Sequence, residues 1–198
     1  MNPLALIIFV KNPELGKVKT RLAETVGDEK ALEIYKALLK HTKDVALQLN
    51  ADRMLYYSED VPEEEDMWPD DDFQKYIQYG EVLGERMYYA FEDALAVHDK
   101  AIIIGSDCAS LTPEIVAEAF DALDRFNFVV GPATDGGYYL LGMKKLQIEM
   151  FQQMPWSTDQ VLPETLARIN ALGKTVYQLP ELSDIDYEED WKKHGWEI

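Results

Sequence analysis

Residues 101–107 read AIIIGSD, four apolar residues followed by glycine, serine and aspartate. A run this rich in isoleucine, with no polar residue in alternation, is typical of a strand buried on both faces of a sheet. In an open, mostly parallel sheet, ligands bind beyond the carboxyl ends of the strands. Asp107 directly follows the apolar run, so it is the first residue expected to carry chemistry.

Similar apolar runs occur on both sides of this strand and alternate with stretches of helical period. Strands are predicted at residues 4–10 (LALIIFV), 54–57, 73–79, 101–107, 128–130, 138–143 and 175–179. Helices are predicted over about 28–49, 84–97, 113–126, 145–153 and 158–172, with a short C-terminal helix from Tyr187. This alternation indicates an α/β layer fold. A chain of 198 residues with 47% hydrophobic residues is expected to form one domain over residues 1–198.

Charge and cysteine content exclude several classes of function. The chain carries 37 acidic and 19 basic residues, a formal charge of −18, which disfavours general binding to nucleic acid or anionic membranes. Its single cysteine, Cys108, excludes an internal disulfide and a multi-cysteine zinc site. The longest apolar run, 4–10, falls far short of the ~20 residues of a spanning helix. It also lacks the flanks of a signal peptide, so a cytoplasmic protein is expected.

A basic loop follows the first predicted strand, in a chain that is otherwise acidic. Residues 11–22 read KNPELGKVKTRL and contain four basic residues and one acid, namely Lys11, Lys17, Lys19, Arg21 and Glu14. Gly16 would let the backbone approach a ligand closely, while lysine and arginine suit phosphate oxygens. The loop is not the GxxxxGK[ST] phosphate loop, and a solvated loop that balances nearby carboxylates is an equally good interpretation.

Three aspartates are candidates for a magnesium site. Mg²⁺ takes few protein carboxylates and completes its shell with water and phosphate oxygens, so Asp107 at a strand end is a natural ligand. Alternatively, Asp107 accepts hydrogen bonds from the helix that begins near Thr112. LSDIDYEED (182–190) follows the last predicted strand and offers Asp184 and Asp186, which would reach Asp107 if the chain returns to the same edge. Their alternative role is to cap the C-terminal helix.

Two further loops at strand ends carry small or polar residues. GPATDGGYYLLG (131–142) holds Asp135 before Gly136 and Gly137, which would let the backbone approach a substrate, although a tight turn also explains the glycines. QYGEVLGERM (78–87) places Gln78 and Gly84 between a strand and a helix start.

Two other segments have a structural explanation at least as good as a functional one. Trp156, in the WST segment 156–158, is expected to pack in the core rather than present an aromatic face to a ligand. Residues 59–72 include nine acids among fourteen residues, which predicts a solvated, extended loop. A metal or protein-docking role is the alternative for this acidic segment.

Taken together, six segments in this order resemble one family across essentially the whole chain: KNPELGKVKTRL, VLGERM, IIIGSDCASLT, GPATDGGYYLLG, WST and LSDIDYEED. The chain is similar to the glycosyltransferase-A-like bacterial family related to 2-phospho-L-lactate guanylyltransferase, within the nucleotide-diphospho-sugar transferase superfamily. The resemblance implies a single domain with a mixed, mostly parallel central sheet flanked by helices. It also implies a nucleotide or nucleotide sugar in the crevice, a small-molecule acceptor, and Mg²⁺ or Mn²⁺ as cofactor.

Carried over by position, the resemblance makes Asp107 the metal aspartate and Asp184 the better match for a distant ligand, with Asp186 in reserve. The remaining matches are Lys17, Lys19 and Arg21 for the phosphate-binding loop, and Gln78 and Gly84 for the base. Gly16, Gly136 and Gly137 join the candidate binding residues only because they would let the backbone approach a ligand closely. The chain departs from the family at Ala109, where proline is usual. Cys108 and Ala109 also replace the second local carboxylate of typical metal-dependent glycosyltransferases.

Nucleotidyl transfer to a small phosphorylated acceptor is the favoured reaction, with Asp107, Lys19 and Arg21 as catalytic residues. Glycosyl transfer, with Asp135 as the base, is the alternative. A further alternative is a protein that binds a nucleotide without catalysing a reaction. A thiol enzyme using Cys108 is disfavoured, because all three histidines lie in predicted helices away from it. The base, the acceptor and the oligomeric state stay open.

Overall fold

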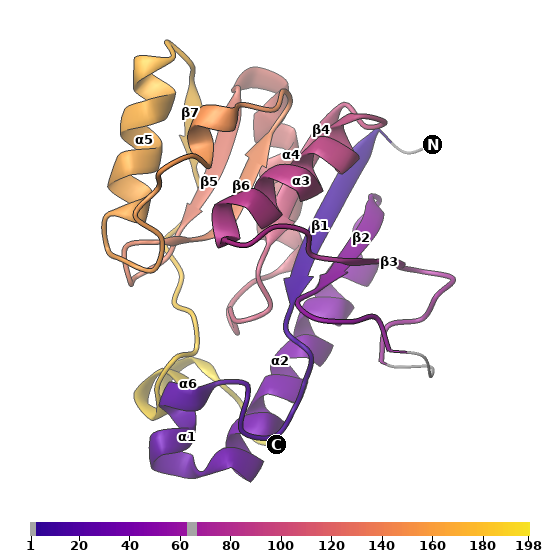
Figure 1. Ribbon diagram of the computed structural model, residues 1–198, viewed down its shortest axis with the longest axis vertical. Coiled ribbons are helices and arrows are strands. Elements are labelled where there is room, and N and C mark those ends of the chain that lie inside the picture. Colours follow the sequence, from indigo (N-terminus) through magenta and orange to yellow (C-terminus); the bar gives the residue numbers. More distant parts are fainter. Residues whose placement is uncertain (1–2, 63–66) are drawn as a thin grey trace.

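The computed structural model describes residues 3–62 and 67–198, which form a seven-stranded sheet with helices on both faces (Figure 1). The strands are β1 (Leu4–Val10), β2 (Asp52–Tyr57), β3 (Gln74–Ile77), β4 (Lys100–Ile104), β5 (Phe128–Pro132), β6 (Tyr138–Met143) and β7 (Val176–Gln178). The helices are α1 (Thr20–Val26), α2 (Asp28–Leu47), α3 (Leu83–Leu95), α4 (Pro113–Arg125), the short 3₁₀ helix η1 (Ile148–Met150), α5 (Val161–Ala171) and α6 (Glu188–His194).

The strand order is β3-β2-β1-β4-β6-β5-β7. Pairing is parallel throughout except at β6, which runs antiparallel to both β4 and β5. The predicted mixed, mostly parallel sheet is therefore confirmed. β1 and β4 lie side by side at its centre, as their uninterrupted apolar sequences require, and β3 lies at an edge.

Alternate residues of the central strands fill two cores. Leu6 and Ile8 of β1 pack on the face that α2 and α4 cover. Ala5 and Ile7 pack on the opposite face, which α3, η1 and α5 cover. In Figure 1, α3 and α5 lie in front of the sheet and α4 behind it.

A third, smaller core joins the helices at the lower end of the molecule in Figure 1 to the sheet. It contains Leu22 of α1 and Ile34 of α2, together with Ala109 and Ile185 from the chain after β4 and β7. Helix α1 was not predicted, because it begins inside the basic segment 11–22, which was interpreted as a loop. None of the helices in the described residues is long and apolar enough to cross a bilayer.

Most predicted elements are present, with ends shifted by a few residues, but the helix predicted at 145–153 is wrong. Only the three residues of η1 are helical there. Arg168 of α5 explains the difference, because its guanidinium donates to the carbonyls of Glu149 at 2.7 Å and Gln153 at 3.2 Å. These carbonyls are thus satisfied from outside, and Pro155 follows shortly.

In the described part of the acidic segment, residues 59–62 and 67–72, the acids are exposed as their charge predicts, but the segment also has a buried anchor. Residues 63–66 lie outside the described part. Trp68 is only 1% exposed and packs edge-on against Phe73, with ring centroids 5.0 Å apart. Asp70 forms an ion pair of 2.6 Å with Lys75 of β3. The tryptophan therefore anchors the acidic segment to the core.

We expect Trp68→Ala to lower the free energy of unfolding by about 3–5 kcal/mol, as for other buried tryptophans. Urea unfolding followed by circular dichroism measures this change. Asp71→Asn, at an exposed position of the same segment, is the matched control and should leave stability within about 0.5 kcal/mol. A loss below about 1 kcal/mol for Trp68→Ala would show that the segment is not anchored.

Candidate active site

The ends of β1 and β4 are joined by the phenol of Tyr35, which reaches them from α2. Its oxygen accepts a hydrogen bond from Lys11 N–H at 2.8 Å, and its O–H faces the Lys11 carbonyl at 3.1 Å. It also lies 3.3 Å from Ser106 Oγ. Because Ser106 precedes Asp107, this contact fixes the backbone that carries the aspartate.

The segment that carries Asp184 and Asp186 docks directly on the chain after β4. Ile185 N–H donates to the Asp107 carbonyl at 2.9 Å, and the Ile185 side chain is fully buried between Ala109 and α1. Residues on either side of a buried side chain in extended backbone point away from it. The structure thus brings both aspartates to Asp107.

Lys19 lies between two of the carboxylates. Its Nζ is 3.1 Å from Asp107 Oδ1 and 3.8 Å from Asp186 Oδ1, and its side chain is only 5% exposed. The backbone of Lys19 is left-handed, with φ 50°, where α1 begins. That conformation costs a non-glycine residue on the order of 1 kcal/mol, so the ion pairs offset a local strain.

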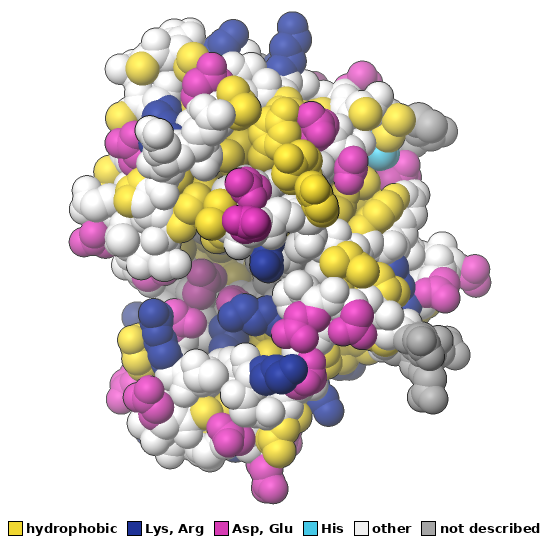
Figure 2. Space-filling model, in the orientation of Figure 1, with side chains coloured by type: hydrophobic (Ala, Val, Ile, Leu, Met, Phe, Trp, Pro, Cys, Tyr) yellow, Lys and Arg dark blue, Asp and Glu magenta, His cyan; other side chains and the backbone are white. Residues whose placement is uncertain are grey.

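Arg21 adds a second cation at the outer side of this cluster. Its NH1 lies 3.1 Å from Asp186 Oδ2, and its side chain is 61% exposed. Figure 2 shows lysine and arginine side chains gathered with acidic ones along a hollow between the sheet and the lower helices. The exposed Arg21 guanidinium can reach an anionic ligand.

The Asp184 carboxyl has the most perturbed acidity of the cluster. Burial raises its pKa to about 7, and the charge of Asp107 acts in the same direction. Lys19 opposes this shift, while Asp135 and Asp186 add to it. The site therefore concentrates more negative charge than Lys19 alone balances, and it favours binding of a further cation.

The chemistry of these donors suits a hard divalent cation, because Mg²⁺ and Mn²⁺ prefer carboxylate oxygen. In the described residues, however, no three acidic, histidine or cysteine side chains already stand in a coordinating arrangement. Asp107 and Asp186 instead face the Lys19 ammonium. A cation held here by Asp107 with Asp184 or Asp186 requires small rotations of these side chains.

Other residues of the basic loop lie apart from this cluster. Lys17 Nζ is 2.7 Å from Glu14 and 3.7 Å from Glu59, and the hydrogen bond to Glu14 raises its pKa. Gly16 adopts φ 76°, with only Asp28 near its free side. Lys17 therefore balances local carboxylates, as the alternative interpretation of the loop holds, while it stays exposed to solvent.

Gln78 is held at the ends of β1 and β2. Its amide N–H₂ donates to the carbonyls of Tyr56 at 3.1 Å and Val10 at 3.3 Å. Gly84, at the start of α3, is buried where a Cβ would lie 2.5 Å from the Phe151 carbonyl and 2.7 Å from Trp156 Nε1. Close packing is thus sufficient to explain the glycine at position 84.

The Asp135 loop is a tight turn with an exposed carboxylate. Asp135 Oδ1 accepts from Gly137 N–H at 2.9 Å, and Gly136 has φ 89°. A Cβ on Gly136 would lie 2.5 Å from the Cα of Asp159. Turn geometry and packing explain both glycines, and the hydrogen bond from Gly137 N–H gives the exposed Asp135 carboxylate a structural role in the turn.

Cys108 lacks the environment of a nucleophile. It is buried, and burial together with the charge of Asp184 raises the pKa of its thiol to about 12. Among the histidines, His41 binds the Leu111 carbonyl and His98 binds Asp52, so neither is paired with the thiol.

Tyr35 and Ile185 are the residues of the site that sequence reasoning missed. Tyr35 belongs to the apolar face of α2 and reads as a core residue. Ile185 carries a weak signal, because an isolated isoleucine between two aspartates indicates a buried position flanked by two exposed ones.

The fold and the similarity to a solved structure place this chain among transferases of the nucleotide-diphospho-sugar class. A crystal structure from Desulfovibrio desulfuricans G20, provisionally assigned as a nucleotide-diphospho-sugar transferase, is 32% identical, with TM-score 0.86 over 94% of this chain and 84% of that one. The inositol-1-phosphate CTP transferase of T. maritima is 13% identical, with TM-score 0.58 over 94% and 90%. Glucosyl-3-phosphoglycerate synthase of Mycobacterium tuberculosis, in complex with Mg²⁺ and UDP, is 11% identical, with TM-score 0.57 over 92% and 70%.

The chain belongs to the family described as "Uncharacterized protein conserved in bacteria (DUF2064)", whose model matches residues 41–158. Among curated protein sequences, none matches it significantly. The resemblance seen in the six sequence segments is thereby confirmed at the level of fold and superfamily.

Asp184→Asn is expected to stabilise the folded protein at about pH 8 by about 1–3 kcal/mol in the presence of a chelator. The folded-state pKa is raised, so the folded protein loses stability as pH rises from the unfolded to the folded value. Asparagine removes this penalty, and the advantage should shrink at about pH 5.5. Urea unfolding at the two pH values measures it. An equal advantage at both would refute the raised pKa.

Proposed function

We propose that this protein is a divalent-cation-dependent nucleotidyltransferase that acts on a small phosphorylated acceptor. The observation that carries the proposal is the near-complete burial of the Lys19 ammonium against Asp107, beside the Asp184–Asp186 segment. This arrangement supplies both signs of charge at the strand ends, where ligands of such sheets bind.

A nucleoside triphosphate is the donor that suits these charges best. Lys19 and the exposed Arg21 would contact its phosphates, and both cations are already positioned through Asp186. Asp107, with Asp184 or Asp186, would hold Mg²⁺ or Mn²⁺. Such a cation neutralises phosphate charge and orients the phosphates when bound.

In this reaction an oxygen of the acceptor phosphate attacks the α-phosphorus of the triphosphate. The bond from the α-phosphorus to the bridging oxygen breaks, and pyrophosphate leaves with the electron pair. Lys19 and Arg21 stabilise the negative charge that develops on this leaving group. The protein contributes positioning and electrostatics and forms no covalent bond to the substrate.

The ligands named for two solved structures with this fold are consistent with the proposed donor and acceptor. The T. maritima protein is named for transfer from CTP to inositol-1-phosphate, a phosphorylated acceptor. The M. tuberculosis synthase was crystallised with Mg²⁺ and UDP.

Glycosyl transfer is the second candidate, and the exposed carboxylate of Asp135 favours it. Asp135 Oδ1 accepts from Gly137 N–H, and the carboxylate is still exposed to solvent, where it could act as the base that activates an acceptor hydroxyl. Its charge is near enough to Asp184 to raise the pKa of that carboxyl, which puts it on the same side of the site.

Asp107→Asn should reduce turnover at least about 100-fold while the protein stays folded, because the divalent cation that neutralises the phosphates would lose a charged ligand. Release of pyrophosphate from a nucleoside triphosphate with a phosphorylated acceptor measures turnover. Asp121→Asn, at an exposed position of α4, is the control and should keep full activity. Activity of the Asp107 variant within twofold of wild type would overturn the proposed site.

The donor is identified by calorimetric titration with nucleoside triphosphates, nucleoside diphosphates and nucleotide sugars, each with Mg²⁺ and with chelator. Preferential, Mg²⁺-dependent binding of a triphosphate is the expected result. Preference for a nucleotide sugar would select glycosyl transfer instead. Tight binding without turnover across a panel of acceptors would indicate a binding protein that has lost the reaction.

A further inference from the structure

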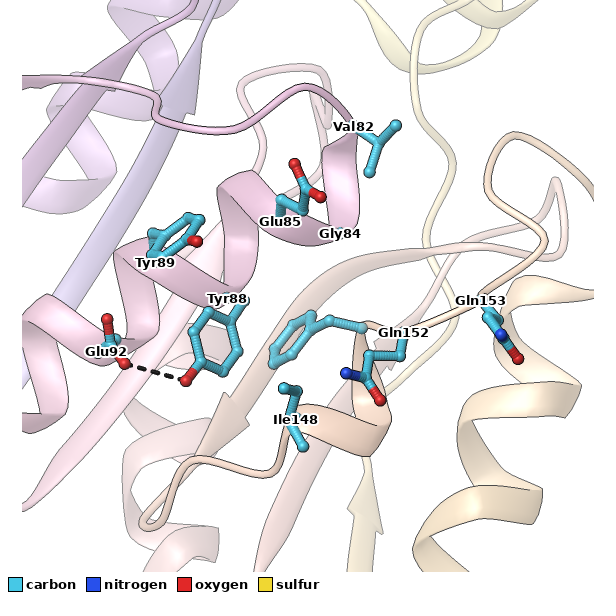
Figure 3. Close-up of a pocket in the computed structure, with 10 residues that line it drawn as sticks. Val82, Gly84, Glu85, Tyr88, Tyr89, Glu92, Ile148, Gln152 and Gln153 are labelled. Atoms are coloured by element: carbon cyan, nitrogen blue, oxygen red, sulfur yellow. Dashed lines mark hydrogen bonds between the residues drawn. The ribbon is translucent and has the colours of Figure 1, made fainter.

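A second cavity lies on the outer face of α3, opposite η1, and contains none of the charged residues of the Asp107 site (Figure 3). Its volume is about 740 Å³, within the range of pockets that bind small molecules. It is lined by Val82, Gly84, Glu85, Tyr88, Tyr89, Glu92, Ile148, Phe151, Gln152 and Gln153. Gly84 alone is shared with the residues considered for nucleotide binding.

Aromatic rings form the walls of this α3 pocket and stand nearly perpendicular to one another. Tyr88 meets Tyr89 at 82° and Phe151 at 79°, with ring centroids 5.4 and 6.1 Å apart. Tyr79, which is 71% exposed, extends the row by meeting Tyr89 at 67°. In such edge-to-face pairs the edge of one ring covers a face of its neighbour, and the ring faces left uncovered can attract a cation that lies over them.

The charge of the pocket has a single sign. Glu85 and Glu92 are two turns apart on α3, with Tyr88 and Tyr89 between them, and none of the ten lining residues is basic. The Tyr88 O–H donates to Glu92 Oε1 at 2.9 Å, which fixes the ring beside the carboxylate, as Figure 3 shows. A nucleotide or other anion is therefore repelled, whereas a cation is attracted to both the acids and the ring faces.

The pocket wall opposite α3, residues 148–153, is fixed by hydrogen bonds from α5. Arg168 of α5 donates to the carbonyls of Glu149 and Gln153, on either side of Phe151, and forms a 2.7 Å ion pair with Glu164. The aromatic walls therefore stand on two supported elements, α3 and the segment held by α5, so little ordering accompanies binding.

We propose that the α3 pocket binds an organic cation, an ammonium group on an apolar body about the size of an aromatic ring. The Tyr88 ring and the Glu92 carboxylate beside it receive the ammonium, and Ile148 and Phe151 cover the apolar body. Glu85, two helical turns away, adds only longer-range attraction. This site is independent of the proposed transfer reaction, which takes place at the β4 end.

A series of three ligands of nearly equal shape tests the proposal: 2-phenylethylammonium, 2-phenylethanol and phenylacetate. Each is titrated into the ¹⁵N-labelled full chain, and amide shifts of residues 82–92 and 148–153 are followed. The ammonium is expected to bind at least about tenfold more tightly than the neutral alcohol, with no saturation by the carboxylate. Equal affinity for all three, or no saturable shift with the ammonium, would overturn the proposal.

Variants then separate charge from shape. The double substitution Glu85→Gln with Glu92→Gln should weaken binding of the ammonium about five- to tenfold. Glu118→Gln is the matched control, because Glu118 accepts a hydrogen bond from Tyr177 at another face, as Glu92 does from Tyr88. An unchanged affinity in the double variant, with a spectrum that shows an intact fold, would refute the role of charge.

Two further measurements isolate this site. Asp107→Asn should keep the affinity for 2-phenylethylammonium, so loss of the transferase site and loss of the α3 pocket are distinguishable. Sedimentation velocity at the concentration of the titration should show a monomer with or without the ammonium. A dimer that the ammonium does not dissociate, and in which residues 82–92 show no shift, would mean that a second copy covers the pocket, against the proposal.

Discussion

The hydrogen bond from Ile185 N–H to the Asp107 carbonyl is the constraint on which the site depends. It joins the chain after the last strand to the chain after the central strand, 78 residues earlier. The Ile185 side chain is buried beneath this junction in the small core that contains Ala109 and Leu22. Leu182, two residues before Asp184, is held by backbone hydrogen bonds with Pro132 and Thr134, and the Ile185 contact carries the docked segment on to Asp107. With it, three carboxylates share one edge of the sheet.

The junction brings like charges together, which by itself opposes folding. Lys19 compensates only in part, and it does so from a left-handed backbone that lysine does not favour. Strain and repulsion at one place, in a fold whose cores are otherwise apolar, are the pattern expected of a functional site. A bound cation and a phosphate would relieve the charge imbalance that the protein alone leaves.

Features set by residues close together in the sequence could be predicted from it, whereas features set by contacts between distant segments could not. The sheet was predictable because β1 and β4 show their burial in their own composition, and the position of Asp107 follows from the strand that precedes it. The presence of helix α1 and the absence of a full helix over 145–153 were not predictable, because Leu22 and Arg168 act through contacts with distant segments. Trp68 likewise anchors its acidic segment by burying a ring, which the charge of that segment does not indicate. Lys19 and Asp107 were expected at the same edge of the sheet, but the geometry of their ion pair depends on α1.

Gly84 shows why residue matches alone do not assign a site. In the family resemblance this position accompanies the nucleotide base, yet here the missing Cβ admits the Phe151 carbonyl and the Trp156 indole to the start of α3. The same close approach brings Phe151 to the wall of the α3 pocket. A larger residue at 84 would displace both the helix start near Gln78 and that wall, so its effects on nucleotide and cation would arise from one distortion. Charge substitutions, which leave the backbone in place, are therefore the ones that can tell the two sites apart.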